Sequence, residues 1–143
     1  MLPPPPFDSS CPQLLALPCA GQPADGFTVA PAGLPFAVAR VYWTYATPDG
    51  VQRGHHAHYG GEQVLVAVHG RLSIALENPA GQVLRFELHR PDQGLYVPGL
   101  YWRTIRFHAP AVLLCLASEP YSEASYLRDY AAFRALGAAP AAS

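Results

Sequence analysis

Stretches that alternate hydrophobic and polar positions fill most of the chain beyond about residue 35. Residues 36–45 (FAVARVYWTY) and 101–108 (YWRTIRFH) alternate in this way and are rich in aromatic and β-branched side chains. Because successive side chains of a strand point to opposite faces, this period of two predicts strands with one buried face. Residues 111–118 (AVLLCLAS) are uniformly apolar, which is typical of a strand buried on both faces.

Residues that favour turns separate these stretches. They occur as TPDG (47–50), PAG (79–81) and PDQG (91–94). We expect residues 62–70 and 71–78 to form a hairpin that turns at Gly70, with further strands over 82–89 and 95–99. About seven short strands at this spacing predict an all-β fold, either a sandwich or a small barrel.

The pattern changes near the C-terminus. Side chains spaced by four, three and three residues form a helical stripe that consists of Tyr126, Tyr130, Phe133 and Leu136. We therefore predict a short helix within residues 121–137, with Ser122 as its N-cap and Gly137 at its end.

The 143 residues suffice for one domain with a substantial core. Residues 1–25 are rich in proline and lack a positively charged start, so we predict a disordered lead-in and not a signal peptide. Residues 26–137 form the predicted domain, and 138–143 are expected to fray. Cys11, Cys19 and Cys115 are odd in number and widely spaced, which predicts no disulfide framework and favours the cytoplasm.

Composition narrows the classes of function. The formal net charge is −1 and no basic run occurs, so nothing indicates nucleic acid or an anionic membrane as a partner. No apolar run approaches the roughly 18 residues that span a bilayer. All nine basic residues are arginine, which excludes a catalytic lysine and Schiff-base chemistry.

Three of the six histidines fall within RGHHAH (53–58). On a strand, His56 and His58 share a face because they are two residues apart, whereas His55 points to the other side. An unpartnered buried imidazole is unfavourable, so the pair predicts either metal ligands or acid–base groups. Glu62 follows and either sets a histidine tautomer or is solvated.

The spacing of His56, His58 and Glu62 follows the first motif of cupin barrels, in which two histidines and a glutamate converge on a metal. A second cupin motif lies in GLYVPGLYWR (94–103). Metal-binding cupins carry a histidine at its end, where this chain has Arg103. A guanidinium cannot ligate a metal, so this second motif supports the barrel and weakens the case for a metal.

These blocks resemble one family. RGHHAH, then EQVLVAVHGRLSIAL, GLYVPGLYW and AVLLCLASEPYSEASYLRDYAAF follow in order the pattern of the WxcM-like sugar 3,4-ketoisomerases, over roughly residues 36–136. The resemblance implies a small antiparallel cupin (jelly-roll) barrel with a short C-terminal helix. It also implies a homodimer that acts on a dTDP-linked 4-keto-6-deoxyhexose without metal or organic cofactor.

By this resemblance, His56 and His58 are the proton-transfer pair that moves the keto group from C4 to C3 through an enediol. Histidine suits this chemistry because its pKa lies near neutrality. Arg103 is a candidate to stabilise the enediolate, and the arginine fork also suits a pyrophosphate. The residues expected to bind substrate are Arg53, Arg103, Tyr42, Tyr45 and Glu62.

The chain departs from the family pattern in places. Tyr59 stands where the family has lysine, Ser125 replaces an aspartate, and Arg103 replaces a histidine of the active site. Two alternatives therefore stay open: a metal-dependent cupin enzyme that uses His56, His58 and Glu62, and a cupin that binds a nucleotide sugar without catalysis. The configuration of the product at C4 is not determined by these residues.

Overall fold

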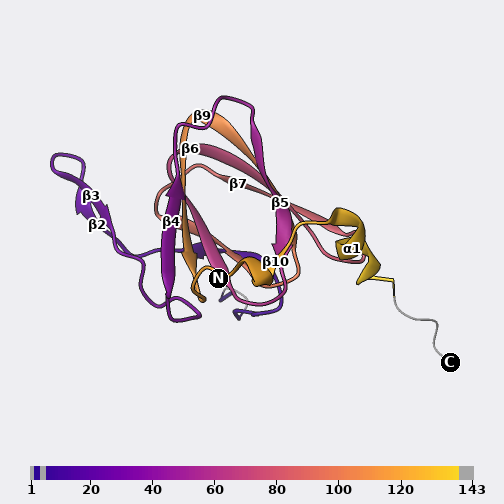
Figure 1. Cartoon of the computed structure of the whole chain (residues 1–143). Coiled ribbons are helices and arrows are strands. Elements are labelled where there is room, and N and C mark those ends of the chain that lie inside the picture. Colours follow the sequence, from indigo (N-terminus) through magenta and orange to yellow (C-terminus); the bar gives the residue numbers. More distant parts are fainter. Residues whose placement is uncertain (1, 4–5, 139–143) are drawn as a thin grey trace.

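The computed structural model describes residues 2–3 and 6–138 and shows an antiparallel β-barrel of the cupin type (Figure 1). Eight strands follow the order β1-β8-β6-β9-β5-β10, with β4 beside β9 and β7 beside β6, and β2 and β3 form a separate hairpin. The strands are β1 (Gln13–Ala16), β2 (Cys19–Gln22), β3 (Gly26–Val29), β4 (Arg40–Thr44), β5 (Gln52–His58), β6 (Gln63–Glu77), β7 (Val83–Leu88), β8 (Gln93–Val97), β9 (Trp102–Ala117) and β10 (Tyr126–Leu127).

Two long bent strands, β6 and β9, organise the barrel. The prediction of a hairpin that turns at Gly70 is wrong, because β6 continues through that residue. Gly70 has φ 74°, and a Cβ there would lie 2.1 Å from the carbonyl oxygen of Pro110 on β9. The glycine therefore lets two strands cross closely and bends β6 instead of reversing it. In the same way, β9 unites two strands that the sequence predicted separately.

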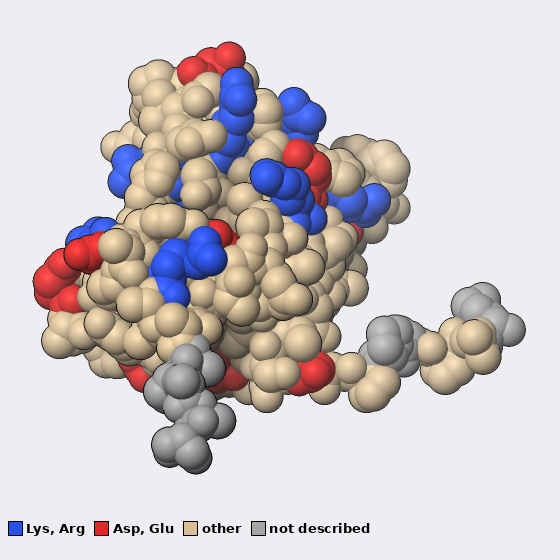
Figure 2. All heavy atoms as spheres, turned by 90° about the vertical axis from the view of Figure 1, so that its right-hand side faces the viewer, with Lys and Arg blue, Asp and Glu red and all other residues tan. Residues whose placement is uncertain are grey.

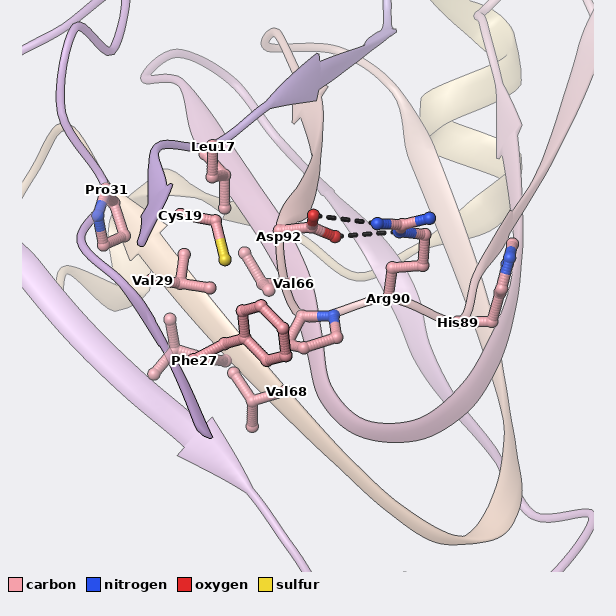
Figure 3. Close-up of a pocket in the computed structure, with 12 residues that line it drawn as sticks. Leu17, Cys19, Phe27, Val29, Pro31, Val66, Val68, His89, Arg90 and Asp92 are labelled. Carbon is pink, nitrogen blue, oxygen red and sulfur yellow. Dashed lines mark hydrogen bonds and ion pairs between the residues drawn. The ribbon is translucent and has the colours of Figure 1, made fainter. Parts of the chain in front are cut away.

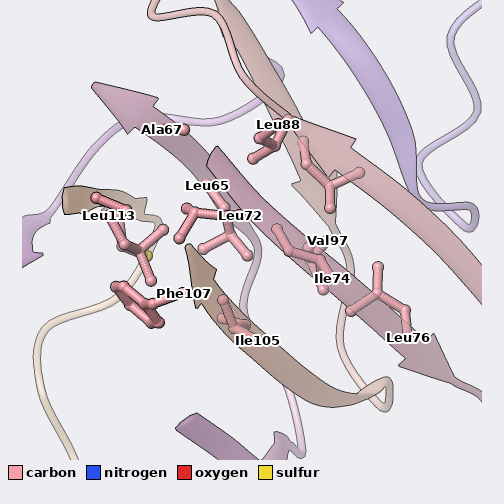
Figure 4. Close-up of a cluster of buried hydrophobic side chains, with 13 residues drawn as sticks. Leu65, Ala67, Leu72, Ile74, Leu76, Leu88, Val97, Ile105, Phe107 and Leu113 are labelled. Carbon is pink, nitrogen blue, oxygen red and sulfur yellow. The ribbon is translucent and has the colours of Figure 1, made fainter. Parts of the chain in front are cut away.

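The bent sheet encloses the main core (Figure 4). Alternate residues of β6 and β9 point inward, so Leu72 and Phe107 lie opposite each other in the register and both are fully buried. Each such side chain contributes about 1.5–3 kcal/mol by leaving water. The leucine, isoleucine and valine members of the core are Leu65, Leu72, Ile74, Leu76, Leu88, Leu95, Val97, Ile105 and Leu113.

The N-terminal segment covers the outer face of the sheet. Within the lead-in predicted as disordered, β1 pairs with β8 and Leu17 is buried against Val66 and Tyr96. The prediction of disorder is wrong for these strands, because the edge of β8 supplies backbone partners that the proline-rich composition does not reveal.

The predicted C-terminal helix is shorter than expected. Within residues 121–129 the chain forms a turn of 3-10 helix, η1 (Glu123–Ser125), followed by strand β10. The helix α1 spans only Tyr130–Ala135. Asp129, not Ser122, caps α1 by accepting from the Ala132 N–H at 3.1 Å. Gly137 lies just beyond the helix, as expected. Most of the predicted fraying tail, residues 139–143, lies outside the described residues.

α1 packs beside β5, against residues of β5, β9 and β10. Phe133 is fully buried and packs with Ala57, Trp102 and Leu127. No helix in the described part of the chain is long and apolar enough to cross a membrane.

Candidate active site

A β-bulge in β5 places the histidines. Gly54 and His55 have φ angles of 99° and 53°, and the register with β9 shifts between Gly54, which pairs with Thr104, and His56, which pairs with Arg103. A Cβ on residue 54 would lie 2.7 Å from the Arg103 carbonyl oxygen, so glycine is required there. The bulge adds one residue to β5 and changes which side chains face inward.

The inward face of β5 follows from its partners on β9. Arg103 and the core residue Ile105 are two residues apart and share a face. Their cross-strand partners are His56 and Arg53, which therefore also face the inside of the barrel. Without the bulge, Arg53 and His56 would point to opposite faces.

His56 and His58 share a face as predicted. Their ring centroids lie 5.0 Å apart with the planes at 87°, while His55 is exposed. Between them, Ala57 points the other way and is buried beneath α1.

Tyr126 completes the wall around the two imidazoles. It pairs with His58 across β10 and β5, and its ring centroid lies 4.4 Å from that of His58 and 4.9 Å from that of His56. Sequence reasoning assigned Tyr126 to the helical stripe and missed it as a site residue. The signal that could have found it is Asp129, a preferred N-cap residue that starts the helix after Tyr126.

His56 has a free ring nitrogen inside the protein. Its Nδ1 lies 3.0 Å from the Gly54 carbonyl oxygen, which can only accept, so Nδ1 carries the hydrogen. Its Nε2 is buried and has no hydrogen-bond partner among the described residues. Burial, and then the charge of Arg103, lower the pKa of His56 to about 4. At neutral pH the group is thus an uncharged base with an available lone pair.

His58 is more enclosed, with 7% of its surface exposed. Burial lowers its pKa to about 3, and the charges of Arg103 and His56 act in the same direction. Its Nε2 faces the side-chain amide nitrogen of Gln63 at 3.4 Å. Both histidines are therefore neutral over the physiological range.

Arg103 lies beside the pair and is only 3% exposed. Its Nη1 donates to Gln63 Oε1, whereas its Nε is buried without a partner among the described residues. The ion pairs found in the described part of the chain do not include it. Burial lowers its pKa, but a guanidinium remains protonated. A buried cation without a carboxylate favours any negative charge that develops near it.

Glu62 does not join the histidines. Its carboxylate accepts from the Tyr96 hydroxyl at 2.5 Å, and its backbone N–H donates to Ser118 Oγ at 2.8 Å. Its neighbour Gln63 is the residue within hydrogen-bond distance of His58, so the structure does not support the alternative in which Glu62 sets a histidine tautomer. A role of Glu62 in binding substrate stays a prediction. Among residues 2–3 and 6–138, no three His, Cys, Asp or Glu side chains are grouped to hold a metal ion.

The other predicted substrate residues differ in placement. Tyr42 faces the core opposite Cys115, under the guanidinium of Arg40 at 4.8 Å, and burial raises its pKa. Arg53 lies on the inner face but is exposed. Tyr45 follows the end of β4 and is 70% exposed, so the structure does not bring it to the histidines.

A hollow lies on the side of the sheet opposite the two histidines. It measures about 770 Å³ and separates the β2–β3 hairpin from the outer face of β6 (Figure 3). Leu17, Phe27, Val29 and Val66 line it, and the Arg90–Asp92 ion pair stands at one edge. Because neither His56 nor His58 lines it, this hollow is separate from the histidine site.

Comparison with known sequences finds a matching family and a curated relative. The family described as FdtA: WxcM-like, C-terminal, matches residues 20–137. The TDP-4-oxo-6-deoxy-alpha-D-glucose-3,4-oxoisomerase of Aneurinibacillus thermoaerophilus is 36% identical over 103 residues, which are 71% of this chain and 73% of that protein.

Solved structures agree with this. The sugar 3,4-ketoisomerase QdtA of Thermoanaerobacterium thermosaccharolyticum, in complex with TDP, superposes with a TM-score of 0.82 at 30% identity, covering 89% of this chain and 94% of that one. A 3,4-ketoisomerase from Helicobacter canadensis gives 0.81 at 33% identity, over 89% and 97%. The TDP-quinovose 3,4-ketoisomerase WlaRB of Campylobacter jejuni gives 0.79 at 34% identity, over 87% and 97%.

Proposed function

Because the chain belongs to the FdtA family of WxcM-like proteins, we propose that it is a sugar-nucleotide 3,4-ketoisomerase of deoxysugar biosynthesis. Its substrate in this proposal is a TDP-linked 4-keto-6-deoxyhexose. The observation that carries the proposal is the pair of neutral, inward-facing imidazoles of His56 and His58 beside the buried Arg103.

The reaction needs only proton transfers. The C4 ketone acidifies the hydrogen on C3, and a base removes it. The electron pair left on C3 forms the C3–C4 double bond, while the carbonyl electrons move to the C4 oxygen. A proton then passes from the C3 oxygen to the C4 oxygen, and C4 accepts a proton. The product is a 3-ketone with a 4-hydroxyl, and no oxidant is consumed.

His56 is suited to the step at carbon. Its Nε2 is unprotonated and has no other partner among the described residues, so it can accept the C3 proton. His58 is suited to moving the proton between the two oxygens, since its ring lies 5.0 Å from that of His56 on the same face. A positioned acid or base of this kind contributes about 10²–10⁴-fold to a rate.

The two arginines serve different parts of the substrate. Arg103 is buried next to the imidazoles, where its charge stabilises the enediolate more than the neutral ketone. Arg53 faces the same side but reaches solvent, which suits the pyrophosphate. Figure 2 shows several arginine side chains, separated by acidic and uncharged ones, on the side of the molecule that carries β5 and α1.

We also propose that the protein is a homodimer. The β2–β3 hairpin projects from the barrel (Figure 1), and nearly all of its residues are exposed. An isolated two-stranded hairpin is marginally stable in water. On β4, the outward side chains of Val41 and Trp43 are 48% and 61% exposed. A second copy would cover these apolar surfaces.

The cytoplasmic location remains a prediction, supported by three free cysteines.

A conversion assay tests the function. The purified protein is incubated with TDP-4-keto-6-deoxyglucose after dialysis against a chelator, and the products are separated and identified by NMR. The proposal expects a TDP-3-keto-6-deoxyhexose at an unchanged rate after chelation. Binding of the substrate without turnover would contradict it, as would activity that returns only when a divalent metal is added.

A further inference from the structure

The side-chain amide of Gln63 stands between two groups of the site. Gln63 is the first residue of β6 and is 5% exposed. Its oxygen accepts from Arg103, and its nitrogen lies 3.4 Å from His58 Nε2. A guanidinium can only donate hydrogen bonds, so the amide oxygen must face Arg103 and the amide nitrogen must face His58.

This orientation determines where His58 holds its hydrogen. The amide nitrogen of Gln63 can only donate, so the His58 Nε2 that it faces must accept. A neutral imidazole has one accepting nitrogen and one that carries hydrogen, which places the hydrogen of His58 on Nδ1.

The two histidines then offer complementary atoms. In His56 the Gly54 carbonyl occupies Nδ1–H and leaves the accepting Nε2 free. In His58 the Gln63 amide occupies the accepting Nε2 and leaves the N–H of Nδ1 as the other polar atom of the ring. One ring thus presents an acceptor and the other a donor.

We propose that Gln63 is a positioning residue that links Arg103 to His58 and holds His58 in the tautomer with its hydrogen on Nδ1. The proposal rests on the proposed function only where it assigns His58 a part in proton transfer. Because an amide has a fixed accepting end and a fixed donating end, the charge of Arg103 orients the amide, and the amide orients the histidine.

The tautomer can be read directly. Protein labelled with ¹⁵N-histidine gives ring nitrogen signals by long-range ¹H–¹⁵N correlation at pH 7, and a His58→Asn sample identifies which signals belong to His58. We expect a protonated Nδ1 and an unprotonated Nε2. A hydrogen on Nε2 of His58 would overturn the proposal without any variant of Gln63.

Two near-isosteric variants test the consequence for catalysis. In Gln63→Glu, a carboxylate accepts hydrogen bonds from both Arg103 and His58, so the hydrogen of His58 moves to Nε2. The acid limb of the pH profile then moves to higher pH. In Gln63→Met, both hydrogen bonds are lost. We expect kcat to fall by about 10- to 100-fold in each, with a smaller change in KM. This is at or below the roughly 10²–10⁴-fold contribution of a positioned acid or base, because His58 itself remains.

The matched control is Thr47→Val. Thr47 is 7% exposed, and its buried hydroxyl has no partner among the described residues, so the substitution removes no hydrogen bond. We expect its kcat and its tautomer spectrum to equal those of the unmodified protein. Circular dichroism shows whether the Gln63→Glu variant is folded. If it is folded and keeps the wild-type kcat and pH profile, the proposal is wrong and Gln63 has only a packing role. A wild-type protein without isomerase activity would instead overturn the proposed function, while the tautomer spectrum would still decide the position of the hydrogen.

Discussion

His56 and Arg103 are cross-strand partners on β5 and β9, so an imidazole with a free buried nitrogen lies beside a buried guanidinium. This relationship keeps His56 neutral, because burial and the neighbouring charge both disfavour the imidazolium. It also places a cation where an enediolate would form. The same pair thus supplies the base and the stabilisation of the charge that the base creates.

The pH dependence of kcat/KM should reflect this neutral base. With the pKa of His56 lowered to about 4, the rate should stay nearly flat between pH 8 and pH 5. A histidine with an ordinary pKa near 6.5 would lose roughly thirtyfold over the same range. Steady-state kinetics in a constant-ionic-strength buffer series distinguish the two.

Stability should change with pH in the same window, with a definite sign. Because the folded pKa values of His56 and His58 lie below the unfolded value, the unfolded chain binds more protons as the pH falls below about 6.5. The free energy of unfolding contributed by these groups is therefore complete above that pH. It is lost as the pH falls towards about 4 for His56 and about 3 for His58. Urea unfolding at pH 7.5 and pH 5.5 should show a lower midpoint at the acid pH, and an equal midpoint would contradict the burial argument.

Removing the charge of Arg103 should affect both rate and titration. In Arg103→Met, kcat should fall by about 10²–10³-fold, as when one donor to a developing oxyanion is removed. The acid limb of the residual activity should move towards pH 6.5, because Arg103 is the next cause after burial that lowers the pKa of both histidines. A lower kcat with an unmoved limb would assign Arg103 a purely steric role.

The packing of α1 should be needed for stability. Phe133 is fully buried among Ala57, Trp102 and Leu127, so Phe133→Ala should lower the free energy of unfolding by about 3–5 kcal/mol. Leu136→Ala is the matched control, because Leu136 is the C-cap of that helix and is 52% exposed, so its truncation should change the value by less than about 0.5 kcal/mol. Equal effects of the two variants would show that α1 does not anchor β5.

If the protein is a homodimer through β4, a charged substitution on the exposed face of β4 should lower the molecular mass of the protein in solution. Trp43→Glu places a carboxylate on the exposed apolar face of that strand and should convert a dimer to a monomer in light scattering after gel filtration. Leu136→Glu, at the exposed C-cap of α1, should leave the mass unchanged. A monomer in the unmodified protein would refute the homodimer outright.

The sequence predicts the barrel well where the determinants are local. Alternation along residues 36–45 and 101–108 is enough to predict strands, because burial of one face requires it. Gly70 shows the limit: a glycine favours a turn and a close crossing equally, and only the nearby Pro110 carbonyl decides between them. The pairing of β1 with β8 cannot be predicted from the local sequence either, because it depends on a strand far along the chain.

At the site, too, features set by the local sequence could be predicted and features set by distant contacts could not. A spacing of two residues predicts that His56 and His58 lie together, and the structure confirms it. The bulge at Gly54 and His55, which turns Arg53 to the inner face, needs the register with β9. Tyr126 and Gln63 were missed for a related reason: each reaches a histidine across a strand pair or a barrel interior, and no local pattern records such a contact.

Proton NMR of the reaction in deuterated water tests the central claim most directly. With TDP-4-keto-6-deoxyglucose, the unmodified protein should remove the C3 proton signal and form the 3-keto product. His56→Asn should do neither, whereas His58→Asn should still exchange the C3 proton but form product at least about a hundredfold more slowly. Product formation by His56→Asn at the rate of the unmodified protein, or undiminished loss of the C3 proton signal in that variant, would contradict the account of His56 as the base.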